Sequence, residues 1–290
     1  MRNESTASRV FDVFNVILMI ILACVFLYPI LYIVALSFSD ASAIVSGKVY
    51  LFPVNFNISA YQMLFKDDSI IRSVLFTVQL TVSGVFSSLL MTVLAAYPLS
   101  RSHLQGSRII MRLIVFTMYF SGGIIPTYMI IRGMGLFNSI WSLILPSVID
   151  TFLLIIMINS FQTIPVELEE AAKVEGCSNF GVFRRIFLPL STAVIATQIV
   201  FYSVAYWNTF FNALLYIQDP KRLTLQVKLY QVLNMFSDSL SDAAGSGNVK
   251  VIPENLKGAT VCIAVLPIVC VYPFMQKYFV KGVTVGAVKG

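Results

Sequence analysis

The run FNVILMIILACVFLYPILYIVALSF, residues 14–38, contains no charged side chain. A helix needs about 20 mostly apolar residues to cross the hydrocarbon core of a membrane, which is about 30 Å thick. A signal peptide is the alternative, because Arg2 and Arg9 precede the run, but its apolar core would be only about 7–15 residues long. The length of the run therefore predicts a retained membrane helix.

Five further apolar segments follow it, at residues 71–99, 109–131, 139–161, 191–217 and 259–279. Hydrophobic residues make up 58% of the 290-residue chain and charged residues only 12%, whereas soluble domains have roughly 25% charged residues. So few charges cannot cover a soluble surface, which excludes a soluble enzyme, a disordered chain and a secreted disulfide-rich scaffold. We predict an all-α polytopic membrane protein with six transmembrane helices in a single domain, residues 1–290.

The positions of the basic residues indicate an orientation in the membrane. With six spans both termini lie on one side, and the basic residues divide almost evenly between the two sides. Short loops count most in the rule that basic residues stay in the cytoplasm. The short basic segments 101–112 and 277–289 therefore predict cytoplasmic N- and C-termini. The outside loops are then residues 40–70 and 219–258, and the second contains a predicted amphipathic helix at 225–235.

The densest charge on the predicted inside lies between the fourth and fifth spans, in residues 163–189. This loop predicts two short helices joined by Gly176, which suits the left-handed conformation that ends many helices. Pro165 suits the start of the first helix, and Ser178 suits the N-cap of the second. Acidic residues complement the helix dipole in the first turn, namely Glu167, Glu169 and Glu170. A polar helix pair with two small alanines at its centre is a candidate docking surface.

The same loop resembles the EAA loop of the permease subunits of bacterial ATP-binding cassette (ABC) importers. The residues that match this motif at its spacing are Glu170, Ala171, Ala172, Gly176, Ile186, Leu188 and Pro189. Residues 205–210 (AYWNTF) and the C-terminal segment 276–290 are similar to stretches of the maltose-type, binding-protein-dependent carbohydrate permeases. Within that family the chain resembles the LplC/YtcP-like branch, which is associated with complex or acidic oligosaccharides.

The resemblance implies the ABC importer type I permease fold in the inner (cytoplasmic) membrane of a bacterium. It implies that a second, homologous permease supplies the other half of a pathway for a sugar, and that an extracellular solute-binding protein delivers this sugar. Two ATPase subunits would bind ATP and Mg²⁺, and each would receive one EAA loop as a coupling helix. Glu170 would then meet the ATPase surface, with Ala171, Ala172 and Gly176 setting the fit.

The residues themselves give no sign of catalysis. The sequence has no GxxxxGK[ST] phosphate-binding loop, so we expect neither ATP nor any other cofactor on this chain. His103 is the single histidine, which excludes a metal site with two histidine ligands. The four cysteines lack CxxC spacing and are typical of buried thiols. We expect no metal, no catalytic residue and no nucleic-acid partner.

Polar side chains within the spans are the candidates for the sugar pathway, because such groups are costly in lipid and usually face the bundle interior. Asp150 is the only acidic residue deep within a predicted span. The other candidates lie on the fifth span, namely Gln198, Tyr202, Tyr206, Trp207 and Asn208. Steps of four residues place Gln198, Tyr202 and Tyr206 on one helix face. The alternative roles are hydrogen bonding between helices for the amides and anchoring at the membrane interface for the aromatics.

Other functions stay open at this point. A permease for a non-sugar solute would carry the same EAA motif. A stand-alone secondary transporter would need ion-coupling carboxylates inside the spans, where only Asp150 is available. A membrane-embedded enzyme would need a catalytic constellation at membrane depth, which the sequence lacks. The EAA motif favours the importer permease.

Overall fold

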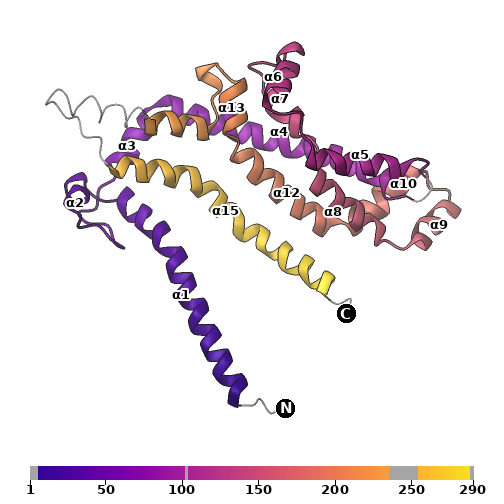
Figure 1. Cartoon of the computed structure of the whole chain (residues 1–290), viewed down its shortest axis with the longest axis horizontal. Coiled ribbons are helices and arrows are strands. Elements are labelled where there is room, and N and C mark those ends of the chain that lie inside the picture. Colours follow the sequence, from indigo (N-terminus) through magenta and orange to yellow (C-terminus); the bar gives the residue numbers. More distant parts are fainter. Residues whose placement is uncertain (1–5, 102–103, 235–253, 288–290) are drawn as a thin grey trace. The chain divides into compact units, whose positions relative to one another are not determined.

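The computed structural model describes residues 6–101, 104–234 and 254–287 (Figure 1). All regular structure in these residues is helical, as predicted. His103 and much of the second predicted outside loop, residues 235–253, lie outside the described residues. The chain divides into two units, Met1–Ile70 with Leu229–Pro267, and Ile71–Lys228 with Ile268–Gly290.

In the first unit, helix α1 (Thr6–Ser37) contains the apolar run that predicted a membrane helix. Within Phe11–Ser37, the most apolar stretch of 18 residues has a mean hydropathy of 2.8 and no buried residue. Leaving this much apolar surface in water would be unfavourable by roughly 25 cal/mol per Å². Its surface is therefore suited to lipid.

Helix α1 and the first part of α15 (Glu254–Ala287) approach each other closely at Gly258. A Cβ atom at Gly258 would lie 3.0 Å from the backbone nitrogen of Ser37 and 3.1 Å from the carbonyl oxygen of Ile33. Asn255 Nδ2 also donates a hydrogen bond to the carbonyl oxygen of Ser39 at 3.2 Å. Glycine thus allows the backbones of two helices to touch, a common device in membrane proteins.

Two short helices follow α1 in the first unit. Asp40 caps α2 (Ala41–Val45), and hydrogen bonds from the Ser42 hydroxyl and amide lower the pKa of the Asp40 carboxyl. In α3 (Ser59–Lys66) the Tyr61 hydroxyl donates to Ser37 Oγ at 2.9 Å. Burial raises the pKa of Tyr61 to about 12, so it remains a donor far above neutral pH. The Tyr61–Ser37 bond ties the loop after α1 back to that helix.

The second unit contains most of α4 (Asp68–Leu99) and a series of shorter helices. In chain order they are α5 (Ser107–Tyr119), α6 (Ile124–Gly133), α7 (Trp141–Ile144), η1 (Leu145–Ser147), α8 (Thr151–Gln162), α9 (Val166–Val174), α10 (Asn179–Val182), η2 (Phe183–Phe187), α11 (Leu188–Leu190), α12 (Thr192–Trp207), α13 (Phe211–Tyr216) and η3 (Pro220–Arg222). Residues 225–234, which the boundary after Lys228 divides between the two units, are also helical, where the sequence predicts an amphipathic helix.

Three segments of the second unit are bent rather than straight. Helices α5 and α6 meet at 113° across Gly123, whose φ of +85° favours glycine. The α7–η1 segment meets α8 at 54°, and the α10–α11 segment meets α12 at 78°. The predicted span 109–131 is therefore two helices, and 139–161 is broken just before Asp150, the residue that caps α8.

The number of membrane spans follows only partly from these helices. Among the described residues, α1 and α4 are long and apolar enough to cross a membrane, and up to five spans result if each bent pair counts as one. The sixth predicted span, residues 259–279, lies within α15. Six spans therefore remain a prediction.

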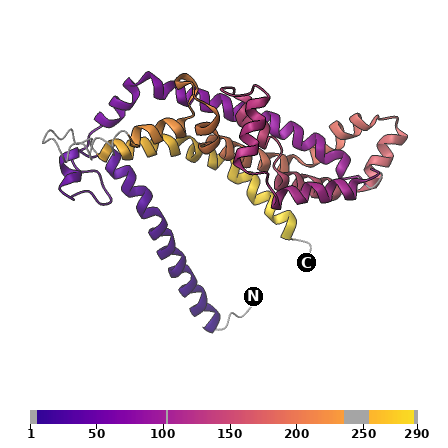
Figure 2. The same ribbon diagram turned by 45° about the horizontal axis from the view of Figure 1, so that its top comes forward.

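Two apolar clusters form the core of the second unit. The first gathers Leu80 of α4 with Tyr202, Tyr206 and Tyr216, and the second surrounds Phe161. In the second cluster the rings of α8 and η2 meet edge to face, since Phe161 and Phe187 have centroids 5.5 Å apart. Helices α9 and α10 lie at one end of the second unit in both views (Figures 1 and 2). Val182 of α10 belongs to the second cluster.

The close approach at Gly258 predicts opposite effects for two glycine-to-alanine changes. Gly258→Ala places a methyl group against backbone atoms that cannot yield easily, so we expect a loss of about 1–3 kcal/mol in the free energy of unfolding. Gly133→Ala is the control, because nothing lies within 4 Å of a Cβ there and alanine is the better helix former. Thermal unfolding in detergent measures this difference, and equal stability of the two variants would contradict the prediction.

Candidate functional site

Helix α9 presents the first half of the EAA motif on its surface. Glu170, Ala171 and Gly176 are exposed, and Ala172 is half-buried. Val174 beside them is 88% exposed, and Phe180 of α10 is 66% exposed. Exposed apolar side chains grouped with small residues at the end of a unit mark a surface that another protein can cover.

Local backbone chemistry explains why the helix pair turns at Gly176. This glycine has a φ of +84°, and its amide donates to the carbonyl oxygen of Lys173 at 3.0 Å. The Cys177 amide donates to the carbonyl oxygen of Ala172 at 2.9 Å, which completes a Schellman motif. Ser178 then caps α10 by accepting from the Gly181 amide at 3.2 Å. Both caps agree with the sequence-based interpretation.

A buried ion pair fixes α9 to the end of α4. Glu169 is only 6% exposed, and its carboxylate pairs with Arg101 Nη1 at 2.5 Å and with Lys173 Nζ at 2.8 Å. Arg101 follows α4 by two residues, so this pair joins segments 68 positions apart in the chain. Glu169 therefore faces inward while its neighbour Glu170 faces outward.

Aromatic rings hold the guanidinium of Arg101 from the other side. Its Cζ lies 3.8 Å from the centre of the Phe187 ring and 5.2 Å from that of Tyr97. Phe187 belongs to η2, a single π-helical turn, which places the ring under the guanidinium. Arg101 Nε and Nη2 are buried without a hydrogen-bond partner in the described structure, so Glu169 is the acceptor that this cation depends on.

The second half of the EAA motif packs rather than protrudes. Ile186 and Leu188 are half-buried against the cluster around Phe161, while Pro189 is exposed. The motif therefore has two parts. Its first residues form an exposed surface on α9, and Ile186 and Leu188 anchor the loop to α8 and α4.

Two hydroxyl pairs connect α12 to α4. The Tyr202 hydroxyl is 2.7 Å from Thr92 Oγ1, and the Tyr206 hydroxyl is 2.7 Å from Ser88 Oγ. All four side chains are buried. The Tyr206 ring lies directly on Gly84, where a Cβ atom would come within 2.7 Å of it. The tyrosines predicted to share a helix face therefore do so, and that face packs on α4.

Two of the predicted pathway residues, Gln198 and Trp207, are buried and line no cleft that the structure shows. Gln198 is fully buried, and its Nε2 donates to the carbonyl oxygen of Leu153 in α8 at 2.8 Å. Trp207 is 7% exposed and lies at the end of α12. Gln198 thus forms the interhelical hydrogen bond that was the alternative interpretation of the amides.

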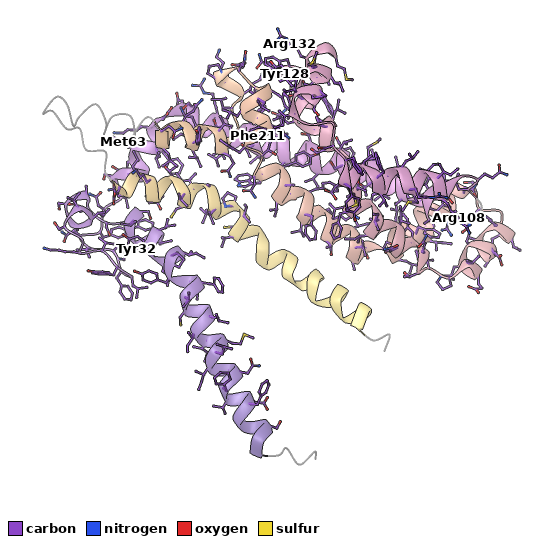
Figure 3. The ribbon with its side chains drawn as sticks, in the orientation of Figure 1. Tyr32, Met63, Arg108, Tyr128, Arg132 and Phe211 are labelled. Carbon is purple, nitrogen blue, oxygen red and sulfur yellow. The ribbon has the colours of Figure 1, made fainter. Side chains whose placement is uncertain are left out.

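The other four candidates line one cleft of about 490 Å³, namely Asp150, Tyr202, Tyr206 and Asn208. Phenylalanines supply much of its wall, namely Phe152, Phe201, Phe210 and Phe211. Phe211 lies on α13, the short helix that follows α12 (Figure 3). A cleft of this volume with aromatic walls and a few polar groups has the usual character of a ligand site.

Asp150 lies at the mouth of a helix break rather than inside a straight span. It is exposed, its Oδ1 accepts from the Leu153 amide at 2.9 Å, and its own amide donates to the Tyr202 hydroxyl at 3.2 Å. The carboxylate therefore caps α8 and keeps lone pairs available to the cleft.

Comparisons with known proteins place this geometry in a family. No protein-family model matches the chain. It is 43% identical to protein LplC of Bacillus subtilis (strain 168) over 99% of this chain and 98% of that protein. It is also 43% identical to the polygalacturonan/rhamnogalacturonan transport system permease protein YtcP of the same organism, over 98% and 99% of the two chains. The chain belongs to the permease subunits of ABC sugar importers.

Solved structures agree with this assignment. The permease resembles a chain in the crystal structure of a bacterial ABC transporter involved in the import of the acidic polysaccharide alginate, with a TM-score of 0.87 and 31% identity over 96% of this chain and 100% of that one. A bacterial alginate ABC transporter in complex with an alginate pentasaccharide-bound periplasmic protein shares the fold, with a TM-score of 0.58 and 15% identity over 94% and 96% of the chains. The family predicted from the EAA motif is confirmed.

Sequence reasoning missed the inward role of Glu169 and Arg101. Glu167, Glu169 and Glu170 all fall in one acidic turn, and only packing decides which of them is buried. Phe210 and Phe211 were also missed as cleft residues, although they lie two and three residues after the candidate Asn208. The available signal was their position beside the end of a span, where a helix break exposes side chains.

The Arg101–Glu169 pair predicts a strong effect of single neutralising changes. Arg101→Met or Glu169→Gln leaves one buried charge uncompensated, so we expect a loss of about 3–5 kcal/mol in the free energy of unfolding and faster tryptic cleavage within residues 163–189. The double variant Arg101→Met/Glu169→Met should recover most of this loss. Lys173→Met is the control, because its side chain is 43% exposed and such pairs contribute under about 1 kcal/mol. If Arg101→Met were as stable as Lys173→Met, the buried Arg101–Glu169 ion pair would not stabilise the loop as proposed.

Proposed function

We propose that this permease forms one half of the translocation pathway for an acidic oligosaccharide and couples it to ATP hydrolysis on partner subunits. The observation that carries the proposal is the exposed front of the EAA motif on α9, mounted on a packed and ion-paired base. Two relatives support the substrate class, since one is named for polygalacturonan and rhamnogalacturonan and the other for alginate. These polymers contain uronic acids.

The loop of residues 163–189, here the coupling loop, has two connections to the cleft. It continues through η2 and α11 directly into α12, which carries Tyr202 and Tyr206. It is also braced through Arg101 to α4, which pairs with the same two tyrosines. A push on α9 by a closing ATPase would therefore move α12 and α4 together as one body, a movement of the kind that produces alternating access.

The cleft of about 490 Å³ is our candidate for the pathway segment in this subunit. Its phenylalanine walls suit the apolar faces of sugar rings, and Asp150 and Asn208 can bond to sugar hydroxyls. The Asp150 carboxylate also opposes long residence of a sugar acid, which suits a site that must release its ligand.

The orientation we propose places the coupling loop and both termini in the cytoplasm of a bacterial inner membrane, with six spans. Helix α4 has 32 residues and so is about 48 Å long, enough to cross the roughly 30 Å hydrocarbon core and extend beyond it. Arg108 lies at the end of the unit that carries α10, while Arg132 lies on α6 (Figure 3). Basic residues beside the coupling loop agree with the preference of such residues for the cytoplasm.

The assembly we propose contains a second homologous permease, two ATPase subunits that hold ATP and Mg²⁺, and an extracellular solute-binding protein. The permease itself would be non-catalytic and carry no cofactor or metal. Its candidate ATPase contacts are Glu170, Ala171, Ala172 and Gly176. Ile186 and Leu188 secure the loop behind them, and the exposed Pro189 completes the motif.

The first test concerns Glu170. Glu170→Lys reverses an exposed charge at the centre of the proposed contact, so we expect at least about tenfold less ATPase subunit to co-purify, with the permease still in the membrane. Glu175→Lys makes the same charge change at another exposed position of the loop and is the matched control. An unchanged yield for Glu170→Lys, or an equal loss in both variants, would contradict the assigned role of Glu170.

The second test concerns the half-pathway. The permease alone in liposomes should transport none of a labelled trigalacturonate, because a single subunit would supply one wall of the pathway. The complete transporter with its binding protein should transport this sugar only when ATP is supplied. Flux of the sugar through the single chain would contradict the half-pathway.

A further inference from the structure

A second cleft, of about 500 Å³, lies at the N-terminal end of α4, whereas the coupling loop is braced at the C-terminal end of that helix. It shares no lining residue with the cleft near Asp150. Three cations line it, namely Arg72 of α4 and Lys221 and Arg222 of η3, together with Trp141 at the start of α7. In the proposed orientation this cleft opens on the outside.

Hydrogen bonds hold the two walls of this outer cleft together. Asn138 has a φ of +58°, and its Oδ1 accepts from the amides of Gln218 at 2.5 Å and Asp219 at 3.2 Å. Arg222 Nη1 donates to the carbonyl oxygen of Asn138 at 3.1 Å. The segment before η3 is thereby fixed against the segment that leads to Trp141, so the cleft has a defined shape.

Three basic residues and no acidic residue line the outer cleft. Asp219 lies beside it, and its carboxylate lies 3.7 Å from Arg222 Nε and also caps η3. Lys221 is exposed and forms no ion pair with any residue that the structure describes. At least one full positive charge at the rim therefore remains for a ligand. Carboxylates fit such sites well, because guanidinium and ammonium groups donate charge-assisted hydrogen bonds to them.

An aromatic face and neutral polar groups accompany the cations. Trp141 is 46% exposed, and Gln79 and Ser139 add an amide and a hydroxyl. A ring with an apolar face, hydroxyls and one carboxylate matches this set of groups. The concave form and the volume suit a small ligand of this kind, whereas a protein partner would need a larger and flatter surface.

We propose that the outer cleft binds a uronic-acid residue of the oligosaccharide at the entrance of the pathway. This inference rests on the proposed function, and it names a site for the charged group of the substrate. Lys221 and the two arginines receive the carboxylate, and the sugar ring stacks on Trp141. An anionic lipid headgroup presents similar chemistry to the cations, and the test separates the two.

The test measures binding of trigalacturonate and trimannuronate, each beside its methyl ester, to the complete transporter in nanodiscs by saturation-transfer NMR. Lys221→Gln and Trp141→Ala should each weaken binding of the free acids by about tenfold. Lys221→Gln should leave binding of the uncharged esters unchanged. Arg132→Gln is the matched control, since it removes an exposed cation that does not line the cleft, and it should change nothing.

Four results would overturn this site. Equal sensitivity of acids and esters to Lys221→Gln would show that the cleft does not recognise the carboxylate. An effect of Lys221→Gln that occurs in phosphatidylglycerol discs and vanishes in phosphatidylcholine discs would assign the cleft to lipid. If wild type and all variants take up the acids normally when ATP is supplied, the outer cleft is not a substrate site, while the proposed import of acidic sugars stands. Uptake of only neutral sugars would overturn the acidic substrate class as well.

Discussion

The antiparallel pairing of α12 with α4 is the interaction on which the rest of the second unit depends. Tyr202 meets Thr92 and Tyr206 meets Ser88, so the contact runs in opposite directions along the two helices. All four hydroxyl groups are buried, and each would be costly to leave without a partner in an apolar environment. Because α12 continues from the coupling loop and α4 ends beside Arg101, this pairing makes one mechanical body from loop to cleft.

Two breaks in the helices lie beside the cleft near Asp150. Asp150 interrupts the segment between η1 and α8, and residues 208–210 interrupt the one between α12 and α13. Backbone groups freed by a break need partners, and here Asp150 Oδ1 and the Tyr202 hydroxyl serve the amides of Leu153 and Asp150. Irregular backbone at membrane depth is stable only where protein or a water-filled cavity surrounds it. The cleft near Asp150 is thus a consequence of how these breaks are satisfied.

Sequence patterns predicted the helical class, the family and the local turns of the coupling loop, because these depend on hydropathy and on local backbone preferences. Gly176 and Ser178 have their predicted roles since a left-handed turn and an N-cap need only neighbouring atoms. The bends were not predicted, because hydropathy measures how apolar a segment is and not its direction. Glu169 could not be distinguished from Glu170, because the difference arises from Arg101, 68 residues earlier. Membrane span number and the exact roles of the pathway residues remain predictions for the same reason.

The tyrosines of α12 also limit how the cleft near Asp150 could bind a sugar. Their hydroxyls are engaged with α4, so the exposed phenylalanine rings, Asn208 and the free lone pairs of Asp150 are what the cleft offers to a sugar. Stacking on ring faces discriminates weakly between sugars, and a carboxylate at Asp150 disfavours a negatively charged one. If this cleft is part of the pathway, as we propose, selection by charge would occur before it. The outer cleft, at the far end of α4 and rich in cations, has the opposite electrostatic character. A sugar acid would pass from a site that attracts its charge to a site that repels it, and this order favours entry and then release.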